Sequence, residues 1–189
     1  MALNWVEDIV YHVYKVKGYM LIENEDLPMP RTEYRSVRGH SDIDIVAIKD
    51  TELVHIECQS WWGPNKDDEE KEFRRLRDRF RRAPDVIFEK YTFLEQGKLK
   101  IRNIFVTSGK PKKSTGKGPW DRLERFCSEN EIELVEINSI IEELIKELRK
   151  RYPKPERVGR EKGIARFIIH LIHNDFLPSH EKRNQQPSS

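Results

Sequence analysis

The stretch HSDIDIVAIKDTELVHIECQ, residues 40–59, is the part of the chain that most clearly indicates its fold. Apolar and polar side chains alternate along both halves, as expected of two strands, and Asp50-Thr51 supplies a two-residue turn between them. We therefore predict strands over 41–48 and 52–59, paired antiparallel with partner numbers that sum to 101. A three-residue loop would shift this register by one, and Asp-Thr is not the best two-residue turn sequence.

The alternation places carboxylates on one face of this hairpin. Asp42 and Asp44 share a face of the first strand, and Glu57 shares a face of the second with His55 and Gln59. In the predicted register Asp44 lies directly opposite Glu57. Like charges opposite each other destabilise a sheet, whereas a divalent cation such as Mg²⁺ takes oxygen ligands from one or two carboxylates. The alternative is that both carboxylates lie at an exposed sheet edge, and we expect His55 to be a structural histidine rather than a ligand.

The rest of the chain divides by hydrophobic periodicity and turn residues. A helix over 3–17, with Asn4 as N-cap, ends at Gly18. Prolines and many charges predict either an irregular loop or a frayed edge over 23–39. Residues 85–98 are read as irregular or partly helical. Strands are also predicted over 19–22, 99–106 and 132–137. A second helix is predicted over 66–82 and ends before Pro84. The remaining predicted helices span 120–130, 138–152, with Asn138 as N-cap, and 160–175.

This order predicts an α/β fold, in which a mixed β-sheet is flanked by helices and a further helix is added at the C-terminus. We expect a core domain over residues 1–152. Pro153 and Pro155 then introduce a helical appendage over 153–178, and a polar, disordered tail follows over 179–189.

Composition excludes several classes of protein. The 189 residues suffice for one domain, and no apolar run approaches the ~20 residues of a transmembrane helix. No signal-peptide pattern is visible at the start, and the two cysteines, Cys58 and Cys127, are too few for a disulfide framework or a clustered zinc site. We therefore expect a cytoplasmic, charge-dense globular protein with no membrane partner.

Charge is segregated along the chain, although the net charge is only +2. Residues 71–82 hold seven basic and two acidic side chains, and residues 146–162 hold eight and three, whereas 129–143 hold six acids and no base. A basic footprint is a local property, so this distribution is compatible with a nucleic-acid partner. The alternative is the dense, mixed surface charge that thermostable proteins often carry.

Two short motifs of the hairpin resemble those of the PD-(D/E)XK nuclease superfamily. Within that superfamily the resemblance is strongest to archaeal Holliday junction resolvases and Mrr-type restriction endonucleases. The acid-bearing strand of that family is similar to Asp44-Ile45-Val46-Ala47, and its Glu-x-Lys strand to Glu57-Cys58-Gln59. Glu7 followed by Gly18-Tyr19 resembles the family's first helix, which carries an acid, and the glycine-aromatic start of its first strand. The resemblance spans residues 7–106 and implies a restriction-endonuclease-like fold.

The resemblance implies a metal-dependent nuclease that hydrolyses DNA phosphodiester bonds, an endonuclease of the restriction or junction-resolving type. Asp44, Glu57 and Glu7 would hold Mg²⁺ or Mn²⁺, and Gln59 would orient the attacking water. Gln59 stands where the family has lysine, and glutamine can orient a water but cannot act as a base. Some active restriction enzymes of the superfamily have glutamine there.

Further side chains are expected to contact nucleic acid. Trp61 could stack on a base, whereas packing of the tandem tryptophans against the core is the alternative. By analogy with nucleases that cut both strands, a homodimer is one expected assembly. The alternative functions are a catalytically inactive nucleic-acid-binding module of the same fold and a protein-interaction subunit of a defence or repair complex. The expected phosphate contacts are Arg74, Arg75, Lys110, Lys112 and Lys113.

Overall fold

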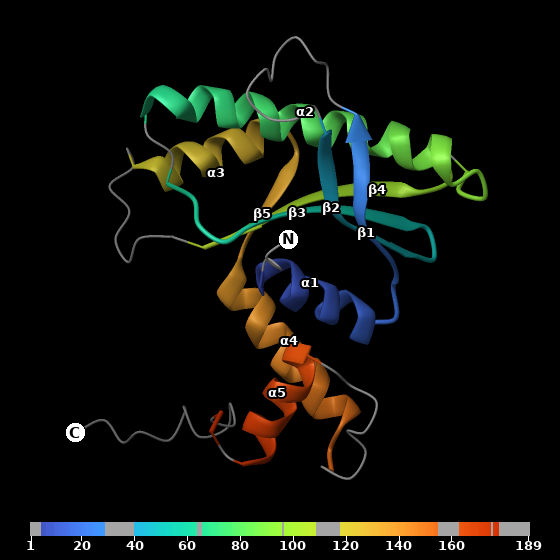
Figure 1. Cartoon of the computed structure of the whole chain (residues 1–189), viewed down its shortest axis with the longest axis vertical. Coiled ribbons are helices and arrows are strands. Elements are labelled where there is room, and N and C mark those ends of the chain that lie inside the picture. Colours follow the sequence, from blue (N-terminus) through green and yellow to red (C-terminus); the bar gives the residue numbers. More distant parts are fainter. Residues whose placement is uncertain are drawn as a thin grey trace.

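The computed structural model describes residues 5–28, 40–63, 66–95, 97–108, 118–154, 163–174 and 176–177. Helices and strands follow one another in the predicted order and form an α/β fold, a mixed sheet flanked by helices with a C-terminal helix (Figure 1). The elements are α1 (Trp5–Val16), β1 (Met20–Pro28), β2 (His40–Lys49), β3 (Glu52–Gln59), α2 (Lys66–Lys90), β4 (Lys100–Thr107), α3 (Pro119–Glu129), β5 (Ile132–Glu136), α4 (Ile137–Arg151) and α5 (Gly163–His173).

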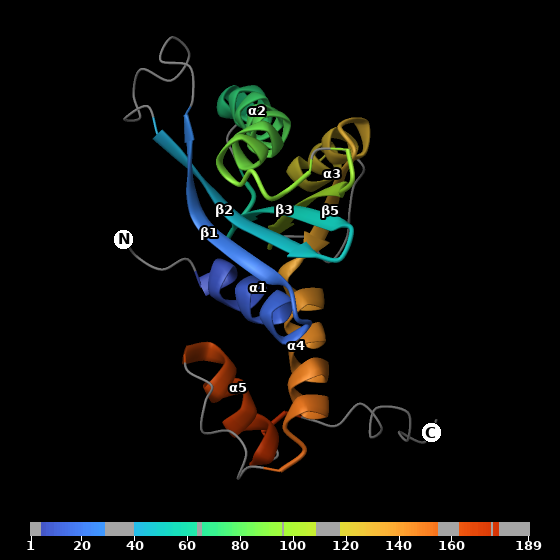
Figure 2. The ribbon, with the colours of Figure 1, turned by 90° about the vertical axis from the view of Figure 1, so that its right-hand side faces the viewer.

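The five strands lie in the sheet in chain order, β1-β2-β3-β4-β5. The first three are antiparallel, and β4 and β5 join parallel to β3 through the connections that contain α2 and α3. These two helices cover one face of the sheet, while α1 and α4 cover the other (Figure 2). The sheet is therefore buried on both faces, which explains the near-continuous apolar character of its central strands.

The hairpin of β2 and β3 has the predicted register. Ile45 pairs with Ile56 and Lys49 with Glu52, so the partner numbers sum to 101. Asp50 has φ 51, the left-handed conformation that a tight two-residue hairpin turn requires of its first residue. Paired residues extend only as far as Ile45 and Ile56, so the ladder stops just before the two carboxylates.

The strict alternation predicted for β2 is wrong at Asp44. Ile43 packs under α2 in the same cluster as Val46, although alternation places it with Ile45 on the other face. On the neighbouring strand β1, Asn24 lies opposite this point and adopts φ 51. A residue with positive φ leaves the extended conformation, on which the regular alternation of side chains between the two faces depends.

Helix α2 runs to Lys90, so the predicted end at Arg82 is wrong. Pro84 lies inside the helix, where proline removes one backbone hydrogen bond and normally ends or bends the helix. Ala83 and Ile87 on either side are fully buried. Their packing on the sheet offsets the missing hydrogen bond, which local sequence rules do not anticipate.

Two other boundaries differ from the prediction. Strand β1 continues to Pro28, so the start of the predicted loop is paired with β2. Helix α4 begins at Ile137 after Glu136, and Asn138 is therefore not its N-cap. The predicted N-cap Asn4 and the tail over 179–189 lie outside the described residues.

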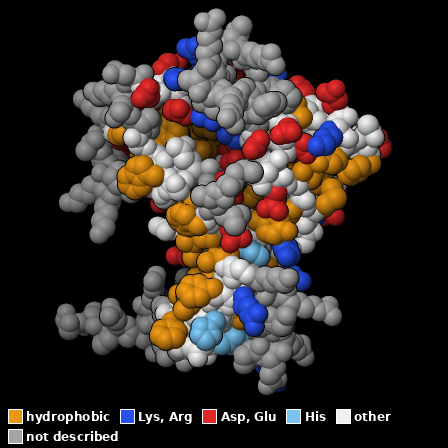
Figure 3. Space-filling model, viewed as in Figure 1, with side chains coloured by type: hydrophobic (Ala, Val, Ile, Leu, Met, Phe, Trp, Pro, Cys, Tyr) orange, Lys and Arg blue, Asp and Glu red, His pale blue; other side chains and the backbone are white. Residues whose placement is uncertain are grey.

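Helix α5 packs against α1 and α4 below the sheet (Figure 2). Its side chains Ala165, Ile168 and Ile169 are buried in the same apolar cluster as those of α1 and α4. Its outer side is mixed, because Phe167 is 56% exposed beside the exposed Arg166 and His170, and Figure 3 shows hydrophobic, basic and histidine side chains at the surface of this lower part. No helix among the described residues is both long and apolar enough to cross a bilayer.

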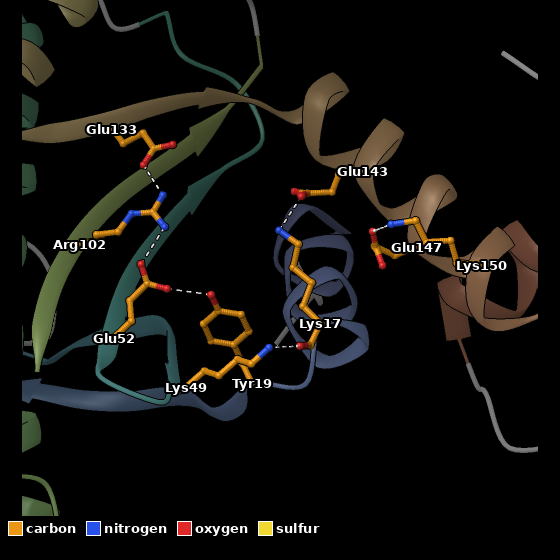
Figure 4. Close-up of polar contacts among 9 residues, drawn as sticks. All are labelled: Lys17, Tyr19, Lys49, Glu52, Arg102, Glu133, Glu143, Glu147 and Lys150. Carbon is orange, nitrogen blue, oxygen red and sulfur yellow. Dashed lines mark hydrogen bonds and ion pairs between the residues drawn. The ribbon is translucent and has the colours of Figure 1, made fainter.

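A chain of polar contacts ties the turn end of the sheet to the helices below it (Figure 4). Arg102 on β4 contacts Glu52 on β3 and Glu133 on β5, so one guanidinium joins three strands. Tyr19 donates a hydrogen bond of 2.7 Å to Glu52. This network lies at the opposite end of β3 from Glu57 and leaves the carboxylate end of the hairpin to other partners.

Candidate active site

Asp44 and Glu57 come together at the open end of the hairpin, where the pairing of β2 and β3 stops. Both side chains are largely buried, Asp44 at 15% and Glu57 at 2% exposure. Oδ2 of Asp44 accepts a hydrogen bond of 2.6 Å from the backbone N–H of Cys58. The two carboxylates therefore lie at the same end of the hairpin, and the backbone of β3 holds the side chain of Asp44 on β2.

Arg79 reaches down from α2 and lies between the two carboxylates. Its Nη2 atom is 3.1 Å from Oδ1 of Asp44 and also contacts Oε2 of Glu57 and the backbone oxygen of Asp42. The guanidinium is 14% exposed. A buried arginine requires buried counter-charge, and here both carboxylates supply it.

Sequence reasoning missed Arg79, which it left among seven basic residues of the same stretch. A signal was present, because Arg79 follows Leu76 by three residues and precedes Ala83 by four. Both of these neighbours are buried on the sheet. A cation on the apolar stripe of a helix points toward the core and predicts an acidic partner there.

His55 holds the second oxygen of Glu57. Its Nε2 is 2.7 Å from Oε1 of Glu57, and its ring packs 4.7 Å from that of Phe80. Burial, together with the charge of Arg79, lowers the pKa of His55 to about 3, so the ring is neutral at physiological pH. A neutral ring can donate only through one nitrogen, and the contact with an ionised Glu57 therefore places the hydrogen on Nε2.

Burial raises the pKa of both carboxyl groups to about 7. At Asp44 the charge of Glu57 raises it further, while Arg79 and the N–H of Cys58 act in the opposite direction. At Glu57 the guanidinium of Arg79 is the main opposing influence, and Arg75 adds to it. One guanidinium does not fully compensate two buried carboxylates, and an added cation would favour their ionised forms.

The oxygens around Nη2 of Arg79 are the kind that a hard cation binds. They come from Asp42, Asp44 and Glu57, two carboxylates and one backbone carbonyl, and they already converge on one positively charged nitrogen. Magnesium usually takes one or two carboxylates and completes its shell with water. Among the described residues no group of three or more His, Cys, Asp or Glu side chains could hold a metal ion. Two carboxylates and one carbonyl are nevertheless donors of the type that a largely hydrated Mg²⁺ or Mn²⁺ accepts, and Arg79 occupies the point where they converge.

A pocket of about 200 Å³ opens beside the carboxylates, between β3 and α2. Its polar side is formed by Glu57, Gln59, Glu72, Arg75 and Arg79. Gln59 is exposed at the end of β3, and Arg75 is half-buried one helical turn from Arg79. The pocket therefore joins the predicted water-orienting residue and a predicted phosphate contact to one of the two carboxylates, Glu57.

The other predicted site residues lie farther out or outside the described residues. Glu7 is half-buried on α1, and its charge helps to raise the pKa of the Cys58 thiol from the other face of β3. Arg74 is exposed on α2. The structure does not describe the loop that carries Lys110, Lys112 and Lys113.

The tandem tryptophans have opposite environments. Trp61 is 63% exposed, whereas Trp62 is 3% exposed. The ring of Trp62 stacks on that of Phe73 with centroids 5.5 Å apart, and it also forms a wall of the pocket. Packing against the core therefore applies to Trp62. Trp61 is exposed, and stacking on a base remains a prediction for it.

Comparisons with known proteins add little to this geometry. No protein-family model matches the chain, and no curated protein matches it. A crystal structure of a protein of unknown function, AF1548, is similar with a TM-score of 0.45 and 14% sequence identity, over 91% of this chain and 98% of that one. A likeness this distant carries no argument about function.

Proposed function

We propose that this protein is a metal-dependent nuclease that hydrolyses DNA phosphodiester bonds. The observation that carries the proposal is the buried pair Asp44 and Glu57, which meet beside a pocket at the open end of a hairpin. Buried like charges at such a site are costly, and perturbed carboxyls in a cleft are typical of functional sites. The resemblance of the two strand motifs to the PD-(D/E)XK superfamily supports the same assignment.

Asp44 and Glu57 would hold Mg²⁺ or Mn²⁺, with the backbone oxygen of Asp42 as a further donor. A bound cation supplies a Lewis acid that polarises the phosphodiester and lowers the pKa of nearby water. His55 keeps Glu57 in one orientation through its 2.7 Å hydrogen bond. Gln59 would orient the attacking water from the pocket, and Arg75 would bind a phosphate oxygen through its planar guanidinium.

A cleavage screen tests this proposal directly. Duplex, junction and single-stranded DNA, together with RNA, are incubated with Mn²⁺ or Mg²⁺ and, as a blank, with chelator. We expect metal-dependent cleavage of DNA that Asp44→Asn lowers at least about a hundredfold, because a cation of this kind contributes several kcal/mol. Glu95→Gln is the matched control, since that carboxylate is 63% exposed and forms a local ion pair with Lys98.

A second candidate, a catalytically inactive nucleic-acid-binding module, is favoured by two observations. Gln59 cannot serve as a base, and Arg79 already neutralises part of the carboxylate charge. Such a module would bind nucleic acid in a salt-dependent way without cutting it, and Asp44→Asn would leave the binding unchanged. Weak binding to every nucleic acid at moderate salt would instead favour a protein partner. Light scattering on the same samples tests the expected homodimer.

A further inference from the structure

Arg79 stands in the place where the proposed cation would be held. All three of its contacts at the site run through one nitrogen, Nη2, which meets oxygens of Asp42, Asp44 and Glu57. A metal ion bound to both carboxylates would need the same oxygens and would repel the guanidinium. Arg79 and a divalent cation therefore cannot occupy the site together.

The guanidinium of Arg79 is held mainly by charge and makes incomplete use of its donors. Arginine usually pairs with a carboxylate through two parallel hydrogen bonds, which use two of its nitrogens. Here Nε of Arg79 is buried with no hydrogen-bond partner. Leaving a buried donor unsatisfied is costly, so the contact is less stable than a fully paired one.

The pocket beside the carboxylates offers the side chain of Arg79 a second position. Arg79 already lines it, and so does Arg75, one turn earlier on the same helix. Glu72 also lines this pocket, but two guanidiniums beside one carboxylate still leave an excess of positive charge that a further anion would neutralise. A phosphate of the nucleic acid is such an anion, and it would lie next to the carboxylate site.

We propose that Arg79 is a displaceable counter-cation, which neutralises Asp44 and Glu57 in the metal-free protein and moves into the pocket beside Arg75 to bind a substrate phosphate when a divalent cation takes its place. This exchange rests on the proposed function, because it requires the carboxylates to bind metal. It makes metal binding and phosphate binding mutually reinforcing, since each removes an obstacle to the other.

A calorimetric titration of the purified chain with Mn²⁺ tests the competition between Arg79 and the cation without any activity measurement. Arg79→Met removes the competing charge at similar volume, and we expect it to bind Mn²⁺ at least about tenfold more tightly than the wild type, given the coupling energies of close charge pairs. Arg81→Met is the matched control, because Arg81 is 77% exposed on the same helix and forms a local ion pair with Asp78. Its Mn²⁺ affinity should equal that of the wild type.

The second half of the exchange is measured with Ca²⁺ and a short DNA duplex. Ca²⁺ should strengthen DNA binding by the wild type, and Arg79→Met should lose most of that gain while Arg81→Met keeps it. If Arg79→Met does not fold, NMR of the Arg Nε–H groups in the wild type provides the readout. The Arg79 signal should shift on addition of Mg²⁺, and the Arg81 signal should not.

The outcomes separate this inference from the proposed function. If the wild type binds Mn²⁺ through Glu57, as shown by loss of binding in Glu57→Gln, but Arg79→Met binds no more tightly, the exchange is refuted and the metal site stands. An Arg79 signal that stays constant as Mg²⁺ saturates the protein refutes it equally. If neither the wild type nor Arg79→Met binds Mn²⁺, the metal site and the exchange are both wrong.

Discussion

Glu57 is buried between a neutral histidine and an arginine. Burial raises the pKa of its carboxyl group, whereas the charge of Arg79 lowers it. Its side chain is 2% exposed and bonded to His55 through one oxygen, while the other oxygen contacts Arg79. Two buried carboxylates face one guanidinium here, so replacing Glu57 alone leaves Arg79 paired with Asp44 and removes the desolvation cost of the second carboxylate. The site is therefore expected to reduce the stability of the metal-free protein.

Glu57→Gln should make the metal-free protein more stable at alkaline pH. The pKa of Glu57 is raised from 4.5 to about 7, so the folded protein binds this proton more tightly than the unfolded chain. The free energy of unfolding therefore falls as pH rises from about 4.5 to about 7, and the substitution makes that fall shallower. We expect a gain of about 1 kcal/mol at pH 8, or about 2–4 °C in Tm, measured by thermal denaturation in chelator.

Glu95→Gln serves as the control for that experiment, since its carboxylate is exposed. A lower Tm for Glu57→Gln throughout the pH range would mean that the charged cluster is net stabilising, contrary to this expectation.

Trp61 and Trp62 should respond oppositely to truncation. Trp62→Ala removes a buried ring stacked on Phe73 and should cost about 3–5 kcal/mol of unfolding free energy in a denaturant titration. Trp61→Ala removes an exposed ring and should leave stability within about 0.5 kcal/mol. If Trp61 meets nucleic acid as proposed, DNA binding weakens by about 1–3 kcal/mol in that variant. Unchanged DNA binding would remove Trp61 from the interface.

At the scale of elements, the part of α2 beyond Pro84 depends on contacts to β1. Glu25 of β1 is 7% exposed and contacts Lys90 at the end of α2. Tyr91, just after the helix, donates a hydrogen bond of 2.7 Å to the same carboxylate. A single acid on the first strand thus anchors the end of the helix that local rules would stop at Pro84.

Glu25→Gln should destabilise the protein at neutral pH by about 2–4 °C in Tm, because it removes a charged acceptor for two hydrogen bonds. Burial alone would raise the pKa of Glu25, but the hydrogen bonds from Lys90 and Tyr91 outweigh it, and the pKa lies below its ordinary value of 4.5. The contribution is therefore present above about pH 4.5 and is lost as pH falls through the lowered pKa.

The measurement is a Tm profile of both proteins between pH 2 and 7, in which the two curves should converge at the acid end. Glu89→Gln, an exposed position on α2, is the control. A constant difference at every pH would show that Glu25 acts through packing rather than through its charge.

For the whole molecule, α5 belongs to the same core as the helices under the sheet. Ile169 is 1% exposed and Ile168 is 6% exposed, in one cluster with residues of α1 and α4. The division predicted from the two prolines separates α5 from the core domain as an appendage. Shared burial predicts instead that α5 unfolds together with the rest, because cooperative unfolding follows continuous packing.

Ile169→Ala should cost about 2–5 kcal/mol and lower hydrogen-exchange protection in the sheet as well as in α5. Phe167→Ala, on the same helix but 56% exposed, is the control and should change little. If the loss of protection were confined to α5 amides, the helix would be the separate appendage that the prolines predict.

The amount that could be predicted depended on how local each feature is. The register of the hairpin, in which partner numbers sum to 101, followed from period-two alternation and a two-residue turn, although the paired residues end at Ile45 and Ile56, before Asp44 and Glu57. The face of Ile43 was predicted wrongly, because the alternation of β2 breaks at Asp44, opposite Asn24 of β1, whose φ of 51 lies outside the extended region. Arg79 was missed because the seven cations of residues 71–82 look alike until the buried side of their helix is identified.

The sequence by itself determined the order of helices and strands, the class of fold and the two carboxylates at the end of the hairpin. These depend on spacing, turn residues and apolar periodicity, which act over a few residues. Only the tertiary structure decided that α2 continues through Pro84, that Trp62 is buried beside an exposed Trp61, and that Arg79 lies between the acids. Each depends on burial against strands distant in the chain, and the free energy of that burial outweighs the local preference.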